Sequence, residues 1–458
     1  MSIPGFRWAV ALPAVLLLNA APVLAGGPND LKANEIKEIR RMIATMKKEY
    51  AARIERLEKR LAEAERRARD AEASARRAED AANAPAAAAP QAANAFNPGI
   101  GLVMNGRLQS FSRPDSEQAI PGFSIGGEGG KGDEGLSLGE SELGISANID
   151  DKFYGQLTAS LVSEGGSDGI DIEEAFIQTL DLPGGFGLKA GRFFSGIGYL
   201  NSFHAHADDF ADRPLPYRAM LNSAYTDDGV ELRWLAPTNW FLELGGELLA
   251  GNHYPAGGRA RNGLGAWALF VHAGGDWDQS NSWTAGLSYL DSEARERESG
   301  DESSPDLFSG NSRLWIADAV WKWAPDGNPY QRNFKLQGEF FLRSESGLFT
   351  PGDGAPTDYS GDQNGWYLQA VYQFMPRWRL GLRIAGLHAD SVGAALAGSS
   401  LDPLGHSPRH YSAMLDWSNS EFSRLRLQFN RDDSRPLSDN QLILQYIVSL
   451  GAHGAHQF

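Results

Sequence analysis

One segment in the middle of the chain contains side chains that could bind a metal ion. His204 and His206 are separated by one residue, and Asp208 follows at the same spacing. Imidazole nitrogen and carboxylate oxygen are ligands for Zn²⁺ and Cu²⁺, so these three residues are candidate ligands. A solvated or loop-packed pair of histidines explains the same pattern, and the lack of a certain third ligand favours it. His453 and His456 are weaker candidates.

The same segment, residues 202–227, carries acidic residues that could face a basic wall. Two later segments that read as nearby strands each carry arginines on one face. An acidic loop opposite a basic wall would create a transverse field that orients polar solutes at a pore constriction. The candidate constriction residues are Asp208, Asp209, Asp212, Arg213, Arg379, Arg383, Arg424 and Arg426. The alternative is that these charges only hydrate a wide lumen.

The sequence contains no motif that predicts catalysis. It has no cysteine, which excludes thiol nucleophiles, thiolate metal ligands and disulfides. It shows no nucleotide-binding loop, nucleophile elbow or zinc-protease motif, and residues 184–187 read as a turn. We therefore expect a protein that is not an enzyme, with no cofactor and no nucleic-acid partner.

The elements that must position these side chains are β-strands, because apolar and polar residues alternate from Pro98 onward. In residues 334–345 the apolar side chains take every second position, beginning at Phe334. Strands that are apolar toward lipid and polar toward a wet lumen are typical of transmembrane barrels. Sixteen antiparallel strands are predicted, at 99–112, 136–149, 152–164, 170–181, 186–201, 228–236, 240–253, 265–277, 282–292, 312–324, 333–346, 364–375, 377–390, 408–418, 422–433 and 440–458.

Short connections alternate with long ones that are rich in Gly, Asp, Ser and Pro. This alternation predicts short periplasmic turns and long outer loops, with both barrel ends in the periplasm. Residues 202–227 form the third outer loop and have more apolar anchors than the other loops, which suits a fold into the lumen. An aromatic girdle is expected near the short turns, formed by Trp240, Trp283, Trp323, Trp378 and Trp417.

The last predicted strand ends in an aromatic residue. Phe458 shares one strand face with Val448 and Tyr446, counted back in steps of two. A terminal Phe in this context resembles the signal by which outer-membrane barrels are recognised for insertion. The barrel-assembly machinery is therefore an expected partner, together with outer-membrane lipid.

The N-terminal region predicts export. Arg7 precedes the apolar run 8–18, and Val23-Leu24-Ala25 ends a cleavage site, so residues 1–25 read as a secretory signal peptide. After Ala25 no segment has about 20 continuous apolar residues. A mature chain in a membrane must then be a closed barrel.

Residues 26–83 read as a periplasmic α-helical coiled coil. Apolar residues recur at steps of three and four from Ile36, on a stripe too narrow for one helix to bury alone. We expect a homotrimer joined through residues 30–83, or a rod that reaches toward peptidoglycan; a solvated single helix is the alternative. An Ala/Pro-rich linker, 84–97, leads to the barrel at 98–458.

Residues 169–201 carry motifs that resemble a known family, the phosphate-selective porin O and P superfamily. The motifs are Ile172-Glu173-Glu174-Ala175-Phe176 and Leu188-Lys189-Ala190-Gly191-Arg192-Phe193. The whole barrel resembles a proteobacterial group often labelled TonB-dependent or zinc-regulated outer-membrane receptors. The resemblance implies a sixteen-stranded, trimeric diffusion channel. A gated receptor needs a plug domain, whereas a coiled coil and linker occupy this position here, which favours an open porin.

The leading prediction is an outer-membrane, porin-like channel for passive diffusion of small hydrophilic solutes. Residues 97–458 hold 26 Lys and Arg against 46 Asp and Glu, a net charge of −20. Many of these Asp and Glu residues are expected in outer loops, for example in residues 293–306. An acidic vestibule concentrates cations, so cation preference is predicted. The alternatives are an outer-membrane receptor for metal (zinc) uptake and a structural cell-envelope tether.

Overall fold

The computed structural model describes residues 98–113, 119–164, 167–258, 263–300, 304–352 and 354–451. The described residues all belong to one compact unit, Phe96–Phe458. The predicted signal peptide, coiled coil and linker lie outside the described residues, as do His453, His456 and Phe458. Within the described ranges, no helix is long and apolar enough to cross a membrane.

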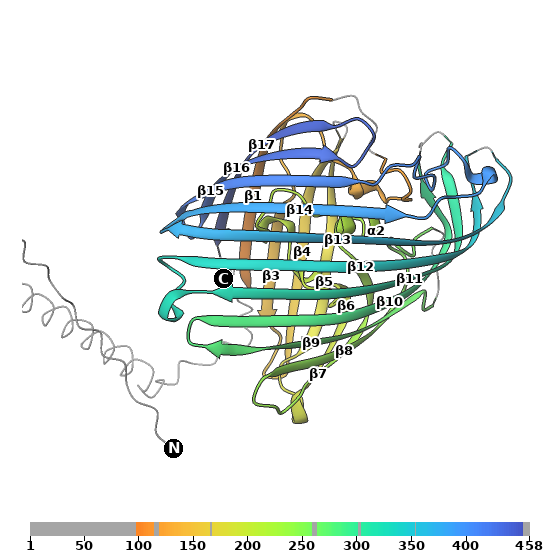
Figure 1. Cartoon of the computed structure of the whole chain (residues 1–458). Helices are drawn as coiled ribbons and strands as arrows, with labels where there is room; N and C mark the ends of the chain where they lie inside the picture. The colour runs from red at the N-terminus through yellow and green to blue at the C-terminus, as the bar shows by residue number, and fades with distance from the viewer. Residues whose placement is uncertain are drawn as a thin grey trace, which may run out of the picture. The chain divides into compact units, whose positions relative to one another are not determined.

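The described part of the chain forms a closed antiparallel β-barrel (Figure 1). From β3 to β17 each strand pairs with the next one in sequence, and β1 closes the ring by pairing with β17 on one side and with β2 and β3 on the other. The short β2 and the longer β3 share one position, so sixteen positions close the ring. The predicted strand number is therefore confirmed.

Each strand lies on a predicted segment, although several differ from it in length. Their bounds are β1 Gly99–Phe111, β2 Gly135–Ser137, β3 Ser141–Asn148, β4 Phe153–Glu164, β5 Ser167–Thr179, β6 Phe186–Phe194, β7 Thr226–Leu235, β8 Phe241–Leu249, β9 Ala266–Asp278, β10 Asn281–Ser299, β11 Asp306–Trp323, β12 Asn333–Thr350, β13 Thr357–Met375, β14 Trp378–Ala389, β15 Arg409–Ser420, β16 Ser423–Asp433 and β17 Asp439–Gly451. The helical elements are short: η1 Gly127–Gly129, η2 Pro183–Gly185, η3 Leu200–Ser202, η4 Ala205–Ala207, α2 Leu215–Met220, η5 Pro325–Gly327 and η6 Ala394–Leu396.

The two faces of the strands differ as the alternation predicts. On β16, Leu427 and Phe429 are 46% and 48% exposed on the outside, whereas Arg426, Gln428 and Asn430 are buried inside. Large apolar side chains are exposed in the same way along the other strands. An apolar outer surface of this extent is stable against lipid and unfavourable in water. The five girdle tryptophans all lie at or beside strand ends that border the short turns.

Four strands are longer than predicted. β10 to β13 contain 18 or 19 residues each, so much of the expected loop sequence at 293–311 and 347–363 is strand. Accordingly, the prediction that the acidic residues 293–306 form an outer loop is wrong for Glu293–Ser299, which belong to β10. This part of β10 carries polar residues on both faces. The alternation of apolar and polar residues that predicts a strand is therefore absent from it.

Residues 195–225, between β6 and β7, fold into the barrel and are called the inner loop below. Leu215, Tyr217, Met220 and Leu221 of this loop are fully buried and belong to one apolar cluster with wall residues such as Phe341. Helix α2, within the loop, packs against β13 and β14 (Figure 1). The predicted inward fold of the third outer loop is confirmed.

Candidate functional site

The root of the inner loop is fixed to the wall by a buried carboxylate. Glu247 of β8 accepts hydrogen bonds from the Ser195 hydroxyl (2.5 Å) and from the Gly196 backbone N–H (2.7 Å). The Gly196 N–H has left the strand ladder, so it needs a partner of this kind. The contact explains why β6 ends at Phe194, although the sequence predicts a strand over 186–201.

A second carboxylate holds the next part of the loop. Glu339 of β12 accepts hydrogen bonds from the backbone N–H groups of Tyr199 and Leu200, both at 3.1 Å. It also accepts one from the Tyr217 hydroxyl at 3.0 Å. Several donors around a buried carboxylate offset its loss of hydration. The loop is thereby joined to a strand across the lumen from its own root.

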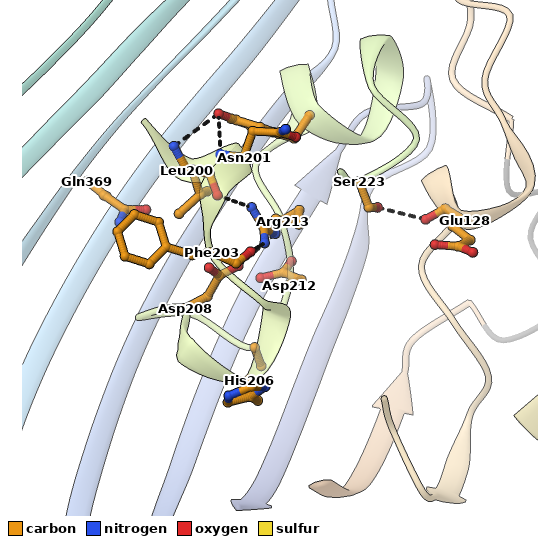
Figure 2. Close-up of polar contacts among 12 residues, drawn as sticks. Glu128, Leu200, Asn201, Phe203, His206, Asp208, Asp212, Arg213, Ser223 and Gln369 are labelled. Atoms are coloured by element: carbon orange, nitrogen blue, oxygen red, sulfur yellow. Dashed lines mark hydrogen bonds and ion pairs between the residues drawn. The ribbon is translucent and has the colours of Figure 1, made fainter. Parts of the chain in front are cut away.

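Arg213 fastens the inner loop to itself. Its guanidinium donates to the carbonyl oxygens of Leu200 (2.7 Å) and Phe203 and forms an ion pair with Asp208, with Nε 2.8 Å from Oδ2 (Figure 2). Only 7% of Arg213 is exposed. Among the predicted constriction residues, Arg213 therefore stabilises the inner loop itself and does not pair with the wall through these contacts. On its other side the loop touches the first outer connection, where the Ser223 hydroxyl donates to the Glu128 carbonyl (Figure 2).

The acidic residues at the tip of the loop pair directly with wall cations. Asp209 contacts Arg379 of β14 at 2.9 Å and also Lys335 of β12. Asp212 contacts Arg383 of β14 at 2.5 Å. Lys335 is a partner that the sequence reasoning missed, although its position on the polar face of a predicted strand was visible.

The other two predicted arginines bind loop backbone. Arg424 donates to the carbonyl oxygen of His206 (2.6 Å), and Arg426 donates to that of Asp208 (2.7 Å). The structure thus brings all the predicted constriction residues together where the inner loop lies on β14–β16. A transverse field needs acids and bases that stand apart, whereas here they meet at contact distance.

The side chains of the two histidines lie against β3 and β5. His204 Nδ1 lies 3.1 Å from a Glu142 carboxylate oxygen and 3.0 Å from one of Glu173, and its Nε2 lies 3.0 Å from Glu174. His206 Nδ1 lies 2.5 Å from the second oxygen of Glu142. The two imidazole rings stack with centroids 5.7 Å apart. Two histidines and three carboxylates therefore form one cluster.

Asp208 is not placed with these histidines. Its carboxylate turns to Arg213, so of the expected ligand set His204, His206 and Asp208 the structure brings together only the two histidines. The 3-10 turn η4, Ala205–Ala207, lies between the first histidine and the aspartate. Residues two apart place their side chains on the same face only in an extended strand. Because η4 is a turn, Asp208 does not share a face with His204 and His206.

A β-bulge brings two neighbouring glutamates into the lumen. The pairing of β4 with β5 joins Thr158 to Glu174 and Ala159 to Ile172, which leaves Glu173 as the extra residue. Glu173 and Glu174 are each 8% exposed, although adjacent strand residues normally face opposite sides. Bulges redirect side chains in this way next to functional sites. The adjacent glutamates in a predicted strand were the signal for these residues, and the sequence reasoning used them only for a family resemblance.

The cluster opens on a cavity of about 360 Å³. Polar side chains of β4 line it beside the histidines, including Gln156 and Thr158. Burial lowers the pKa of His204, but the hydrogen bonds that its ring donates to the carboxylates of Glu142, Glu173 and Glu174 outweigh this effect and hold the pKa well above its usual value. The donor atoms of Glu142, Glu173 and His204 lie within 4.8 Å of one another, which is suitable for a metal ion.

The predicted assembly signal is only partly within the described residues. Tyr446 and Val448 lie on β17, paired with Gly106 and Met104 of β1. Tyr446 is 50% exposed on the outer face. The role of these residues in barrel assembly stays a prediction.

No family model matches the chain. Several solved outer-membrane proteins align with 77% of it. They are the outer membrane channel DcaP of Acinetobacter baumannii (10% identity, 97% of that chain, TM-score 0.48), OprB of Pseudomonas putida (13%, 94%, 0.48) and the anion-selective porin from Comamonas acidovorans (10%, 99%, 0.47).

A relative at higher identity comes from Aquifex aeolicus (strain VF5), where it carries the name "Uncharacterized protein". It is 30% identical over 398 residues, which cover 81% of this chain and 82% of the relative. The similarity therefore extends over most of both proteins. This chain belongs to the same family as the Aquifex aeolicus protein.

Proposed function

We propose that the protein is an outer-membrane channel for the passive diffusion of small hydrophilic solutes. The observation that carries the proposal is a closed ring of sixteen strand positions, apolar outside and polar inside, with the inner loop bound across its lumen. Barrels of about 16 to 18 strands are wide enough to leave an aqueous channel. An apolar outer face on such a barrel is matched to lipid.

The inner loop is the proposed size-selecting element. It is tied to β8 and β12 at its root and to β12 and β14 at its tip. A segment held from several wall strands cannot be displaced by a passing solute without breaking ion pairs and hydrogen bonds. Solutes therefore pass between the loop and the wall that it leaves uncovered, such as the cavity beside β3 and β4.

Cation preference is the finer part of the proposal. The sequence from residue 97 onward has a net charge of −20, and a negative lumen raises the local cation concentration. Replacing Asp208, Asp209 and Asp212 together by Asn should shift the reversal potential toward anions, because their arginine partners lose compensation. Reversal potentials equal to those of the wild type in a KCl gradient would contradict this assignment.

We also propose a homotrimer, joined through the predicted coiled coil at residues 30–83. A trimer would unite three channels, and the same segment could meet peptidoglycan in the periplasm. Chemical crosslinking of the full chain and of a variant without residues 30–83 tests this point. If deletion abolishes an envelope function while conductance persists, the tether interpretation is favoured instead.

The proposal as a whole is tested by conductance in planar bilayers. The full-length protein, folded in detergent, should produce stepwise and ohmic current increments in KCl. Heat-denatured protein from the same preparation is the control. A folded protein that inserts and remains electrically silent would refute the channel.

A further inference from the structure

We propose that the lumen contains a binding site for a divalent transition-metal ion, Zn²⁺ in the first place. Its ligands are His204 Nδ1 of the inner loop, Glu142 of β3 and Glu173 of β5. The site differs from the proposed channel function, since a channel does not require a bound metal. It also differs from the ligand set expected from the sequence, because Glu142 and Glu173 replace His206 and Asp208.

The distances between the donor atoms suit a small metal ion. His204 Nδ1 lies 3.1 Å from Glu142 Oε2 and 3.0 Å from Glu173 Oε2. Ligands at Zn–N and Zn–O distances of about 2.0–2.2 Å in a tetrahedron are about 3.3–3.5 Å from one another. The nitrogen and each of the two oxygens need to separate by only a few tenths of an ångström to admit the ion, and all three donor atoms lie within 4.8 Å of one another. Nitrogen with oxygen ligands fits Zn²⁺ and its neighbours in the first transition row.

The surrounding residues orient the ligands as metal sites require. A histidine that binds metal through one ring nitrogen usually donates its other N–H to a carboxylate, which fixes the tautomer and the ring plane. Here His204 Nε2 lies 3.0 Å from Glu174 Oε2. His206 holds the second oxygen of Glu142 at 2.5 Å, which leaves Oε2 directed at His204. Two of the three ligands, His204 and Glu142, therefore have a partner that keeps them in position.

The charge balance of the cluster calls for a cation. Glu142, Glu173 and Glu174 are 4%, 8% and 8% exposed. Two imidazoles neutralise at most two of these charges. Buried carboxylates are stable when they are paired or coordinate a metal. A divalent ion between His204, Glu142 and Glu173 would supply the missing positive charge.

An ion can reach the site from the lumen. Glu142, His204 and His206 line the cavity of about 360 Å³ together with Tyr154 and other residues of the wall. Polar groups of that cavity can hold the water molecules that complete the coordination. Because the ligands come from the inner loop and from two strands, a bound metal would link the loop to β3 and β5 in addition to the ion pairs with β12 and β14.

The proposal is tested by titrating the metal-free, full-length protein in detergent with Zn²⁺ in a calorimeter. One equivalent should bind, and His204→Ala and Glu173→Gln should each weaken binding at least tenfold. His406→Ala is the matched control, because this loop histidine bonds to the Asp433 carbonyl outside the cluster, and it should bind as the wild type does. Absence of stoichiometric binding, or equal binding by all variants, would overturn the proposal.

A second measurement needs no variant and so does not depend on folding of a mutant. X-ray absorption of the Zn²⁺-loaded wild type should show nitrogen and oxygen ligands at about 2.0–2.2 Å with the scattering signature of imidazole. A shell without imidazole would overturn the site even if the metal binds. Conductance of the same preparations is recorded separately, so failure of the metal site and failure of the channel are distinguishable.

Discussion

Replacing Asp209 and Asp212 together by asparagine should release the tip of the inner loop from the wall. In the wild type, Asp209 pairs with Lys335 and Arg379, and Asp212 pairs with Arg383. The substitutions preserve side-chain size and remove only the charges. The wall cations then lose their partners on the loop, and the docked state of the tip becomes less stable.

The size of the effect follows from burial. The Asp209 side chain is 6% exposed, and the Asp212 side chain is 21% exposed. Removing one partner of a buried ion pair costs about 3–5 kcal/mol, but Asp212 is partly hydrated and Arg379 keeps its contact with Asp416 at 2.5 Å. We therefore expect a total loss of about 3 kcal/mol. This loss changes the ratio of docked to undocked loop about a hundredfold.

Single-channel recording in planar bilayers measures this change. The double variant should show added conductance substates or larger current fluctuations, because the undocked loop becomes populated. Asp433→Asn is the matched control, since it removes one acid from an exposed pair with Arg431, whose side chain is 54% exposed; such pairs contribute about 0–1 kcal/mol. A double variant with the stable, single current level of the wild type would refute the reasoning.

Three further predictions concern stability. Gly191→Ala should sharply reduce the yield of folded, heat-resistant barrel on gel electrophoresis, because Gly191 has φ +129° and a Cβ would lie 2.2 Å from the Ala175 carbonyl; Gly187→Ala, with open space at its Cβ, should fold normally. Arg213→Gln should lower the guanidinium unfolding midpoint through a loss of about 3–5 kcal/mol, since it leaves Asp208 buried and unpaired; an unchanged midpoint contradicts this role. Burial raises the pKa of Asp208 to about 6, partly opposed by Arg213, so the folded state binds a proton that the unfolded state lacks between about pH 4 and 6. As the pH rises from about 4 to 6, the free energy of unfolding of the wild type should fall by up to about 3 kcal/mol relative to that of Asp208→Asn. Parallel pH profiles of the two proteins would contradict this role of Asp208.

The barrel could be predicted from sequence because lipid on one face and water on the other impose a period of two. This pattern is strong in β16, where Leu425, Leu427 and Phe429 alternate with polar residues. The pattern fails in the extended part of β10, where both faces of the strand carry polar residues such as Glu293 and Glu298. There the hydrogen-bonded pairing with β11 makes the strand, and pairing between strands is not visible in one strand's sequence.

The site was predictable only for residues that lie close together in the chain. His204 and His206 were identified from their spacing. Their partners Glu142 and Glu173 are 62 and 31 residues away from His204, and the inward fold of the loop brings them together. The bulge that turns Glu173 inward depends on the register between β4 and β5, which no local pattern specifies.

The most direct test of the channel compares the single-channel conductance of the wild type with that of a variant in which residues 202–213 are replaced by a short Gly-Ser linker. Both proteins should insert as folded barrels and conduct, and the variant should show the larger current steps, because the narrowing segment has been removed. Equal conductance would show that the inner loop does not limit the passage. Silence of both folded proteins would contradict a channel altogether.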